Sequence, residues 1–272
     1  MRIAAFLLAT AFLAGRPKVE VVTPDAPTDV PVARLVSAGA DVQVLRQEKW
    51  AKAAEGRMIR TGESLRTGPD IAILRFPWLR LVAGPETHIA ILPSLVLSAS
   101  LETGRVEQST KGEDIIKLVT REAVVRGSGH LVVRRLAEHT LVSALDGSFD
   151  VANSQGTVHL AAGEGTVVEK SHRGSPPAAL PKIAHELTPG RDPVYFRERE
   201  PVVLRWDSTA PRHHVQVMGF DSDEVVYASD VDGVQLSLHL PLGLFRWHVS
   251  TIGDDAPEGR PSVDGYVCVV AD

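Results

Sequence analysis

Apolar side chains recur at every second position in many short runs of this sequence, and this alternation constrains the fold more than any other feature. In residues 245–249, Phe245, Trp247 and Val249 alternate with polar side chains. A period of two predicts a strand with one buried face and one wet face. Turn-forming residues separate the runs; they include Gly68-Pro69-Asp70, Gly84-Pro85, Asp146-Gly147 and Gly163-Glu164-Gly165.

The close spacing of these runs predicts an all-β protein. Short strands joined by tight turns are typical of a sandwich, a barrel, a roll or a short solenoid, and not of alternating strands and helices. Residues 47–57 have the one helix-like composition after the N-terminal segment, and Gly56 limits the length of that helix.

Composition narrows the classes of function. The chain has 272 residues and a formal net charge of −5, so it has no basic excess to bind the phosphates of nucleic acid. Cys268 is its one cysteine, which excludes an intramolecular disulfide and any zinc site that needs two cysteines. Cys268 lies in an apolar run, 266–270, and we expect a buried, inert thiol there.

The N-terminal segment is typical of an export signal. Arg2 is followed by an apolar run, residues 3–14, and then by Gly15. This run is too short for a membrane-spanning helix, which needs about 20 residues. We therefore expect residues 1–15 to be a signal peptide that directs the chain to the periplasm or cell envelope. No later segment has the length of a transmembrane helix without charges, so we expect the mature chain to be soluble or peripheral to a membrane.

Proline-rich segments divide the chain into two β domains. Proline cannot donate to a sheet ladder, and 171–198 contains Ser175-Pro176-Pro177 and Pro189-Gly190. We expect a linker at 16–35, a first β domain at 36–170, a second linker at 171–198 and a small β-sandwich at 199–272.

Residues 36–168 resemble a FecR-type domain. The resemblance implies a periplasmic β-rich domain (a roll, a sandwich or a short solenoid) used in signalling or envelope scaffolding, and it carries over no catalytic residue. Its landmarks, in order, are Gly39-Ala40-Asp41-Val42, Trp50, the run from Gly56 to Gly68, Ala72-Ile73-Leu74-Arg75-Phe76, Leu101-Glu102-Thr103-Gly104-Arg105-Val106, Glu122-Ala123-Val124-Val125-Arg126-Gly127-Ser128, Leu145-Asp146-Gly147-Ser148-Phe149-Asp150-Val151 and Leu160-Ala161-Ala162-Gly163-Glu164.

Residues 199–272 resemble a fibronectin type III or related immunoglobulin-like module. The resemblance rests on three strand-like runs, and it implies a small β-sandwich. These runs are Val203-Leu204-Arg205-Trp206, His214-Val215-Gln216-Val217 and residues 240–249.

The binding candidates are one aromatic and two arginines. Trp78 falls where a turn is expected, which makes it the best candidate for an exposed aromatic. Arg80 lies between Leu79 and Leu81, and Arg126 lies in the best-marked FecR-like segment. Trp206 and Trp247 occupy the apolar phase of their strands, so we expect both in a core.

Metal and catalytic motifs are weak. His214, His239 and His248 are candidates for a shared metal site on the polar face of the small sandwich, although three separate surface histidines are the simpler interpretation. Residues 127–130, which contain Ser128 and His130, lack an orienting acid and predict a glycine-rich turn. We expect no cofactor and no catalysis.

Three functions remain. The first is a binding or scaffold protein of the cell envelope that contacts protein or peptidoglycan. The second is a sensory module that signals to a membrane partner. The third, a metal-dependent hydrolase, needs clustered ligands that the sequence does not display.

Overall fold

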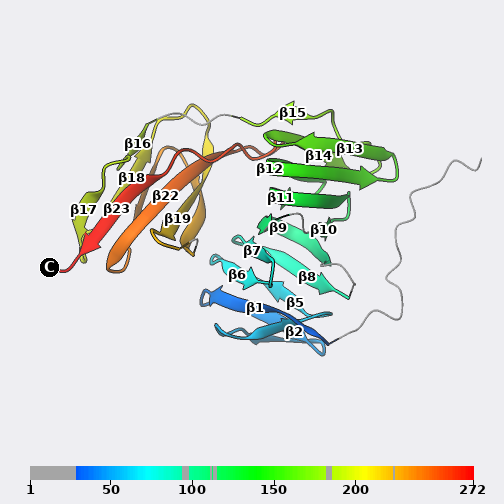
Figure 1. Ribbon diagram of the computed structural model, residues 1–272, viewed down its shortest axis with the longest axis horizontal. Helices are drawn as coiled ribbons and strands as arrows, with labels where there is room; N and C mark the ends of the chain where they lie inside the picture. Colours follow the sequence, from blue (N-terminus) through cyan, green and yellow to red (C-terminus); the bar gives the residue numbers. More distant parts are fainter. Residues whose placement is uncertain (1–28, 94–97, 111, 113–114, 182–185, 223) are drawn as a thin grey trace, which may run out of the picture.

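The protein is all-β, as the alternation predicts. The computed structural model describes residues 29–272 except 94–97, 111, 113–114, 182–185 and 223, so the expected signal peptide lies outside the described residues. The described residues form 23 strands and no helix. Consequently no described helix has the length and apolar character to cross a membrane. Figure 1 shows two units side by side: the first unit holds strands β1–β15, and the second holds β16–β23.

The first unit is one 15-stranded sheet that folds back on itself into two layers. One layer runs β4-β1-β6-β7-β9-β11-β12-β14-β15, and the other runs β3-β2-β5-β8-β9-β10-β11-β12-β13. The strands are β1 (Pro31–Ala38), β2 (Gln43–Arg46), β3 (Lys49–Lys52), β4 (Met58–Arg60), β5 (Ser64–Arg66), β6 (Ala72–Arg75), β7 (Leu79–Ala83), β8 (His88–Leu92), β9 (Ser98–Thr110), β10 (Ile116–Val119), β11 (Val124–Arg135), β12 (His139–Asn153), β13 (Gly156–Ala161), β14 (Glu164–Glu169) and β15 (Ala178–Ala179).

Three long strands, β9, β11 and β12, belong to both layers. The first half of β12, residues 139–144, pairs with β14, and its second half, residues 148–153, pairs with β13. Each strand bends between its two halves at glycine. Gly129 and Gly147 face each other with φ of 122° and 83°, and a Cβ on Gly147 would collide with the carbonyl oxygen of Ser128. Glycine is therefore required where this strand pair turns from one layer into the other.

The core of the first unit lies between the layers. The inward positions are those that the alternation predicts: Leu74 of β6 and Leu81 of β7 are cross-strand neighbours and are both fully buried. Cross-strand pairs of this kind are the unit of sheet stabilisation. Other fully buried side chains are Leu35, Ile59, Leu65, Ile89, Leu101, Ile116, Leu131 and Phe149.

The second unit is a sandwich of a three-stranded and a five-stranded sheet. Trp206 and Trp247 pack in its core, with exposed fractions of 4% and 0%, which confirms their expected placement. The strands are β16 (Leu187–Thr188), β17 (Val194–Arg197), β18 (Val202–Trp206), β19 (Arg212–Gly219), β20 (Val225–Asp232), β21 (Gln235–Leu238), β22 (Gly243–Ile252) and β23 (Gly265–Val270).

Three expectations differ from the structure in detail. Strand β1 begins at Pro31, inside the segment expected to be a linker, and the second expected linker contributes β15, β16 and β17 to the edges of the sheets. Proline is tolerated at such edges, where no ladder bond is lost. The helix-like composition at 47–57 does not produce a helix: Lys49–Lys52 forms β3, because pairing with β2 overrides local helix propensity.

Candidate functional site

The two units meet through the outer faces of two sheets. On the first unit, β1, β6 and β7 present Val36, Ile73 and Val82; on the second, β19 and β20 present Met218 and Ala228. These side chains form one apolar cluster, together with Ile71 and Val225. The outer faces of these sheets, which the alternation predicts to be exposed to water, are therefore covered here by the other unit. Burial of the apolar side chains on these faces favours docking of the units.

Next to this cluster, Arg105 of β9 binds Glu258, which lies in the connection between β22 and β23. Arg105 Nε lies 2.8 Å from Glu258 Oε2, and its Nη2 lies 2.9 Å from Oε1. The Ser250 hydroxyl donates to Glu258 Oε1 at 2.5 Å. Arg105 and Glu258 are only 5% and 2% exposed, so this two-pronged ion pair is almost fully desolvated.

Glu107, two residues further along β9, gathers three partners. Its Oε2 accepts from Arg105 Nη2 at 3.1 Å and from the side-chain amide of Gln216 at 2.5 Å. Its Oε1 lies 2.9 Å from His130 Nε2 on β11. Gln216 belongs to β19 of the second unit, so Glu107 also joins the two units.

Asp230 of β20, whose side chain is 32% exposed, adds a further carboxylate at the junction. Its Oδ1 lies 2.7 Å from His214 Nδ1, and its Oδ2 lies 4.0 Å from the guanidinium groups of Arg134 and Arg212. Arg134, from β11 of the first unit, also donates to the carbonyl of Gly253 at 2.8 Å. We call these groups the junction network; its members are Arg105, Glu107, His130, Arg134, His214, Gln216, Asp230, Ser250 and Glu258.

The junction network keeps its charges despite burial. Burial alone would raise the pKa of Glu258, but the charge and hydrogen bonds of Arg105 outweigh it and lower the pKa. Burial opposes ionisation of Glu107 as well, yet the His130 hydrogen bond and Arg105 lower its pKa well below the usual value. His214 and nearby arginines overcome the burial of Asp230 and lower its pKa to about 2. The carboxylates are thus held ionised by neighbouring charges and by the hydrogen bonds that they accept.

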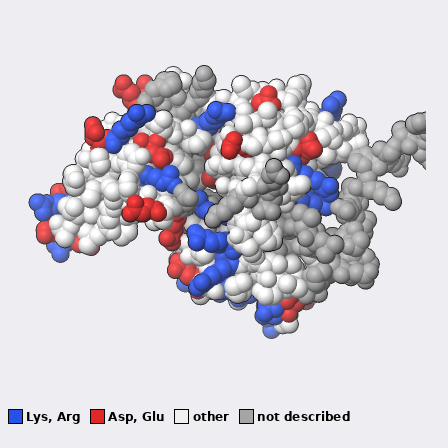
Figure 2. All heavy atoms as spheres, viewed as in Figure 1, with Lys and Arg blue, Asp and Glu red and all other residues white. Residues whose placement is uncertain are grey.

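A pocket of about 420 Å³ opens beside the junction, and arginines from three adjacent strands line it. Arg34 of β1 pairs in register with Arg75 of β6, and Arg75 pairs with Arg80 of β7. We call these three residues the arginine row. Glu55 and Glu224 also line the pocket. In Figure 2, basic side chains gather on the part of the first unit next to the second unit, with acidic side chains beside them.

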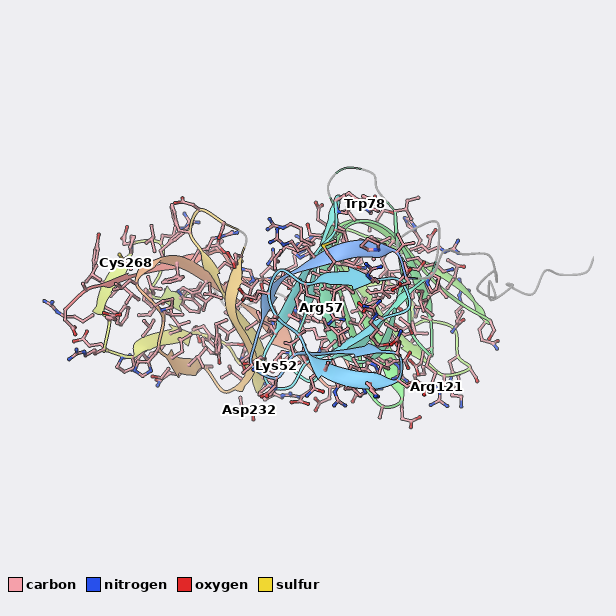
Figure 3. The ribbon with its side chains drawn as sticks, turned by 90° about the horizontal axis from the view of Figure 1, so that it is seen from below. Lys52, Arg57, Trp78, Arg121, Asp232 and Cys268 are labelled. Carbon is pink, nitrogen blue, oxygen red and sulfur yellow. The ribbon has the colours of Figure 1, made fainter. Side chains whose placement is uncertain are left out.

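The predicted binding residues are separated in the structure. Arg80 lines the pocket, whereas Trp78 occupies the turn between β6 and β7 with 39% of its surface exposed, at the rim of the first unit (Figure 3). Arg126 lies on β11 opposite Lys117 and Asp150, and is not among the residues that line the pocket. Of the three candidates, only Arg80 therefore lies in the pocket.

The predicted metal histidines do not converge. His214 and His248 both line a small pocket within the junction, and His248 also lies 3.4 Å from Asp264. His239 lies apart from them, exposed beyond the end of β21 in the other sheet. Among the described residues, no group of three or more His, Cys, Asp or Glu side chains is placed to hold a metal ion.

Two further expectations are corrected. Residues 127–130 are not a turn but the middle of β11, where the register shifts at His130, because the glycines relieve the bend between layers. Cys268 is half-buried on β23 and not fully buried, since it takes the outward phase of that strand. Figure 3 places Cys268 in the part of the second unit away from the first unit.

Sequence reasoning missed most of the junction and of the arginine row. Arg75 and Arg80 each occupy the polar phase of a predicted strand, and Arg34 lies in the expected linker 16–35, so the sequence signals exposure but not the alignment of the three arginines. Arg105 and Glu107 alternate with buried Val106, which was the available signal for a charged strand face. Glu258 lies in a loop whose sequence carries no sign of burial.

The fold and the site define a class: a two-unit all-β protein whose units are joined by buried ion pairs beside an arginine-lined pocket. The sequence matches no protein-family model and no curated protein. Similar solved structures include two crystal structures, at 2.50 Å and 1.65 Å resolution, of a "putative anti-sigma factor" from Parabacteroides distasonis. Each is 16% identical to this chain over 41% of its length, with a TM-score of 0.37. The chain spans little more than half of those proteins, 56% and 57%.

Proposed function

We propose that this protein is a non-catalytic binding or scaffold protein, exported to the cell envelope, that contacts protein or peptidoglycan. The observation that carries the proposal is that its buried charged side chains bind partners within the protein. Arg105 of the first unit pairs with Glu258 of the second, and Glu107 binds Arg105 and Gln216, so these charges hold two β units together instead of facing an open cleft. The resemblances to FecR-type and fibronectin type III domains, and the signal-like N-terminus, support the same function.

Two units that are docked to each other suit such a role. A binding protein presents its surface with less loss of conformational entropy when its parts are fixed in advance. The arginine-lined pocket lies at the side of the junction, where residues of both units meet, including Arg34 and Glu224. Ligand sites are frequently found at such boundaries between domains.

A sensory module that signals to a membrane partner is the second candidate. The observation that favours it is the position of two histidine–carboxylate pairs at the junction, His130–Glu107 in the first unit and His214–Asp230 in the second. Because both pairs lie at the junction, a change in the docking of the two units would change the surroundings of both pairs.

The test combines fractionation with capture. The chain, with and without residues 1–15, is expressed in a bacterium, and we expect only the full chain in the periplasmic or envelope fraction.

The purified protein is then incubated with peptidoglycan sacculi and, separately, with envelope extract under photo-crosslinking. Saturable co-sedimentation or capture of a structural envelope protein supports the binding function, and capture of a membrane regulator supports the sensory one. Cytoplasmic retention of the full chain contradicts export, and turnover of a hydrolase substrate contradicts the absence of catalysis.

A further inference from the structure

We propose that the arginine row forms a binding site for a small ligand with two or more carboxylate or phosphate groups. This inference rests on the proposed binding function and names the chemistry of one ligand. Three observations carry it: the alignment of three arginines, the pocket that they line, and the local charge balance.

The alignment of three arginines on neighbouring strands lowers the stability of the sheet unless a negative charge offsets their repulsion. Arg34, Arg75 and Arg80 are direct cross-strand neighbours on β1, β6 and β7, and like charges placed directly opposite each other destabilise a sheet. Among the described residues, no ion pair engages Arg34 or Arg75, and both are exposed to solvent. A bound anion would relieve this repulsion.

The spacing fits more than one anionic group. Adjacent strands lie about 4.8 Å apart, so neighbouring arginines start from backbones at that spacing. A guanidinium group binds a carboxylate or a phosphate through two parallel hydrogen bonds. A ligand whose anionic groups lie about 5 Å apart can therefore engage two neighbouring arginines at once.

The pocket provides the volume and the surroundings. Its 420 Å³ lies within the range of small-molecule sites, and Val36 and Ile73 supply apolar surface at its base. Three arginines and two glutamates line it, which leaves a local charge of about +1 in a chain whose net charge is −5. Glu55 and Glu224 reduce the positive charge of the pocket and so limit the negative charge of the ligands that it attracts. They can also accept hydrogen bonds from hydroxyl or amino groups of a ligand.

Calorimetric titration with four probes tests the site. Citrate and pyrophosphate carry several anionic groups on a short frame, whereas acetate and inorganic phosphate carry one. We expect citrate or pyrophosphate to bind the full-length protein at a single site, about tenfold or more tightly than its single-group counterpart. Tighter binding of citrate identifies the ligand as a carboxylate compound, and tighter binding of pyrophosphate identifies it as a phosphate compound.

Three variants assign the binding to the pocket. Arg75→Gln is expected to weaken binding about tenfold or more, because it removes charged hydrogen bonds. Glu224→Gln is expected to tighten binding, because it removes a repulsive charge. Arg121→Gln is the matched control, since Arg121 is an exposed arginine in the turn before β11, outside the pocket (Figure 3). Thermal melts confirm that each variant is folded.

Two results would overturn the proposal. One is the absence of binding by citrate and pyrophosphate at about 1 mM, where a weak specific site would respond. The other is an Arg75→Gln variant that binds as tightly as the Arg121→Gln control. If either occurs while the protein still binds sacculi or an envelope protein, the pocket assignment fails and the proposed function stands. Chemical turnover of the bound probe would instead contradict the non-catalytic function and leave the site in place.

Discussion

Arg105 and Glu258 are 153 positions apart in the sequence and lie in different units, yet their side chains form a two-pronged ion pair with contacts of 2.8 and 2.9 Å. Both side chains are almost fully buried. The stability of this protein therefore depends on charges as well as on its two apolar cores.

Replacing one member of this pair should be costly. In Glu258→Gln, Arg105 stays buried but loses its main counter-charge, and removal of one partner from a buried pair typically costs about 3 to 5 kcal/mol. We expect a loss of about 3 kcal/mol in the free energy of unfolding, measured by urea titration with tryptophan fluorescence. Glu138→Gln, at an exposed turn, should change it by less than about 0.5 kcal/mol. Equal effects of the two substitutions would show that the pair does not stabilise the protein.

Acid should weaken the junction before it affects the cores. The pKa values of Glu107, Glu258 and Asp230 are lowered in the folded protein, so the folded state binds fewer protons than the unfolded state at mildly acidic pH. Their stabilisation is complete above the unfolded pKa, near 4.5 for glutamate, and is lost as the pH falls through the folded values, which reach about 2 for Asp230. The groups that face them are Arg105, Arg134, Arg212, His130, His214 and His248.

The measurement is the free energy of unfolding, obtained by urea titration, from pH 7 to pH 2. We expect a decline that steepens below about pH 4.5. In Asp230→Asn the decline should be smaller by about 1 to 2 kcal/mol, after allowance for the partial exposure of Asp230. A free energy of unfolding that is constant down to pH 3 would contradict the ionised junction network.

The apolar part of the junction can be tested separately. Met218 packs against the first unit with an exposed fraction of 4%, and Met218→Asp would bury a carboxylate in an apolar cluster, where its cross-strand neighbour Arg246 is already paired with Asp264. We expect the units to separate while each keeps its strands, seen as a larger radius of gyration by small-angle scattering and as faster proteolysis between residues 170 and 200. Val226→Asp is the control, because Val226 is 42% exposed on the neighbouring strand. An unchanged radius for Met218→Asp would contradict the described docking.

The bend between the layers also has a direct test. Gly147→Ala should lower the free energy of unfolding by about 3 kcal/mol or more, because it combines a positive φ with a backbone collision. Gly62→Ala has a similar φ, 88°, but meets no atom within 4 Å, so it should cost only about 1 to 2 kcal/mol. The difference between the two losses in free energy measures the effect of the collision, because both variants share the strain of a positive φ. Equal losses in the two variants would show that the contact between β11 and β12 is loose.

The sequence predicts the strands better than it predicts their assembly. The alternation at Leu74, Leu81 and Trp247 identifies buried faces, because side-chain direction in a strand is a local property. The alignment of Arg34 with Arg75 depends on the register between strands that are far apart in the sequence, which no local pattern encodes. The burial of Glu258 depends on where a loop docks, so its loop sequence reveals neither its partner nor its role.

The three long strands, β9, β11 and β12, have a consequence for how the first unit can come apart. Each contributes one half of its length to either layer, so the same covalent backbone ties the layers together at three places. The two layers therefore cannot separate from each other while these strands stay paired. A cut within any of these strands removes pairing partners from both layers at once. The first unit is therefore expected to lose its structure as a whole, with no stable half left behind.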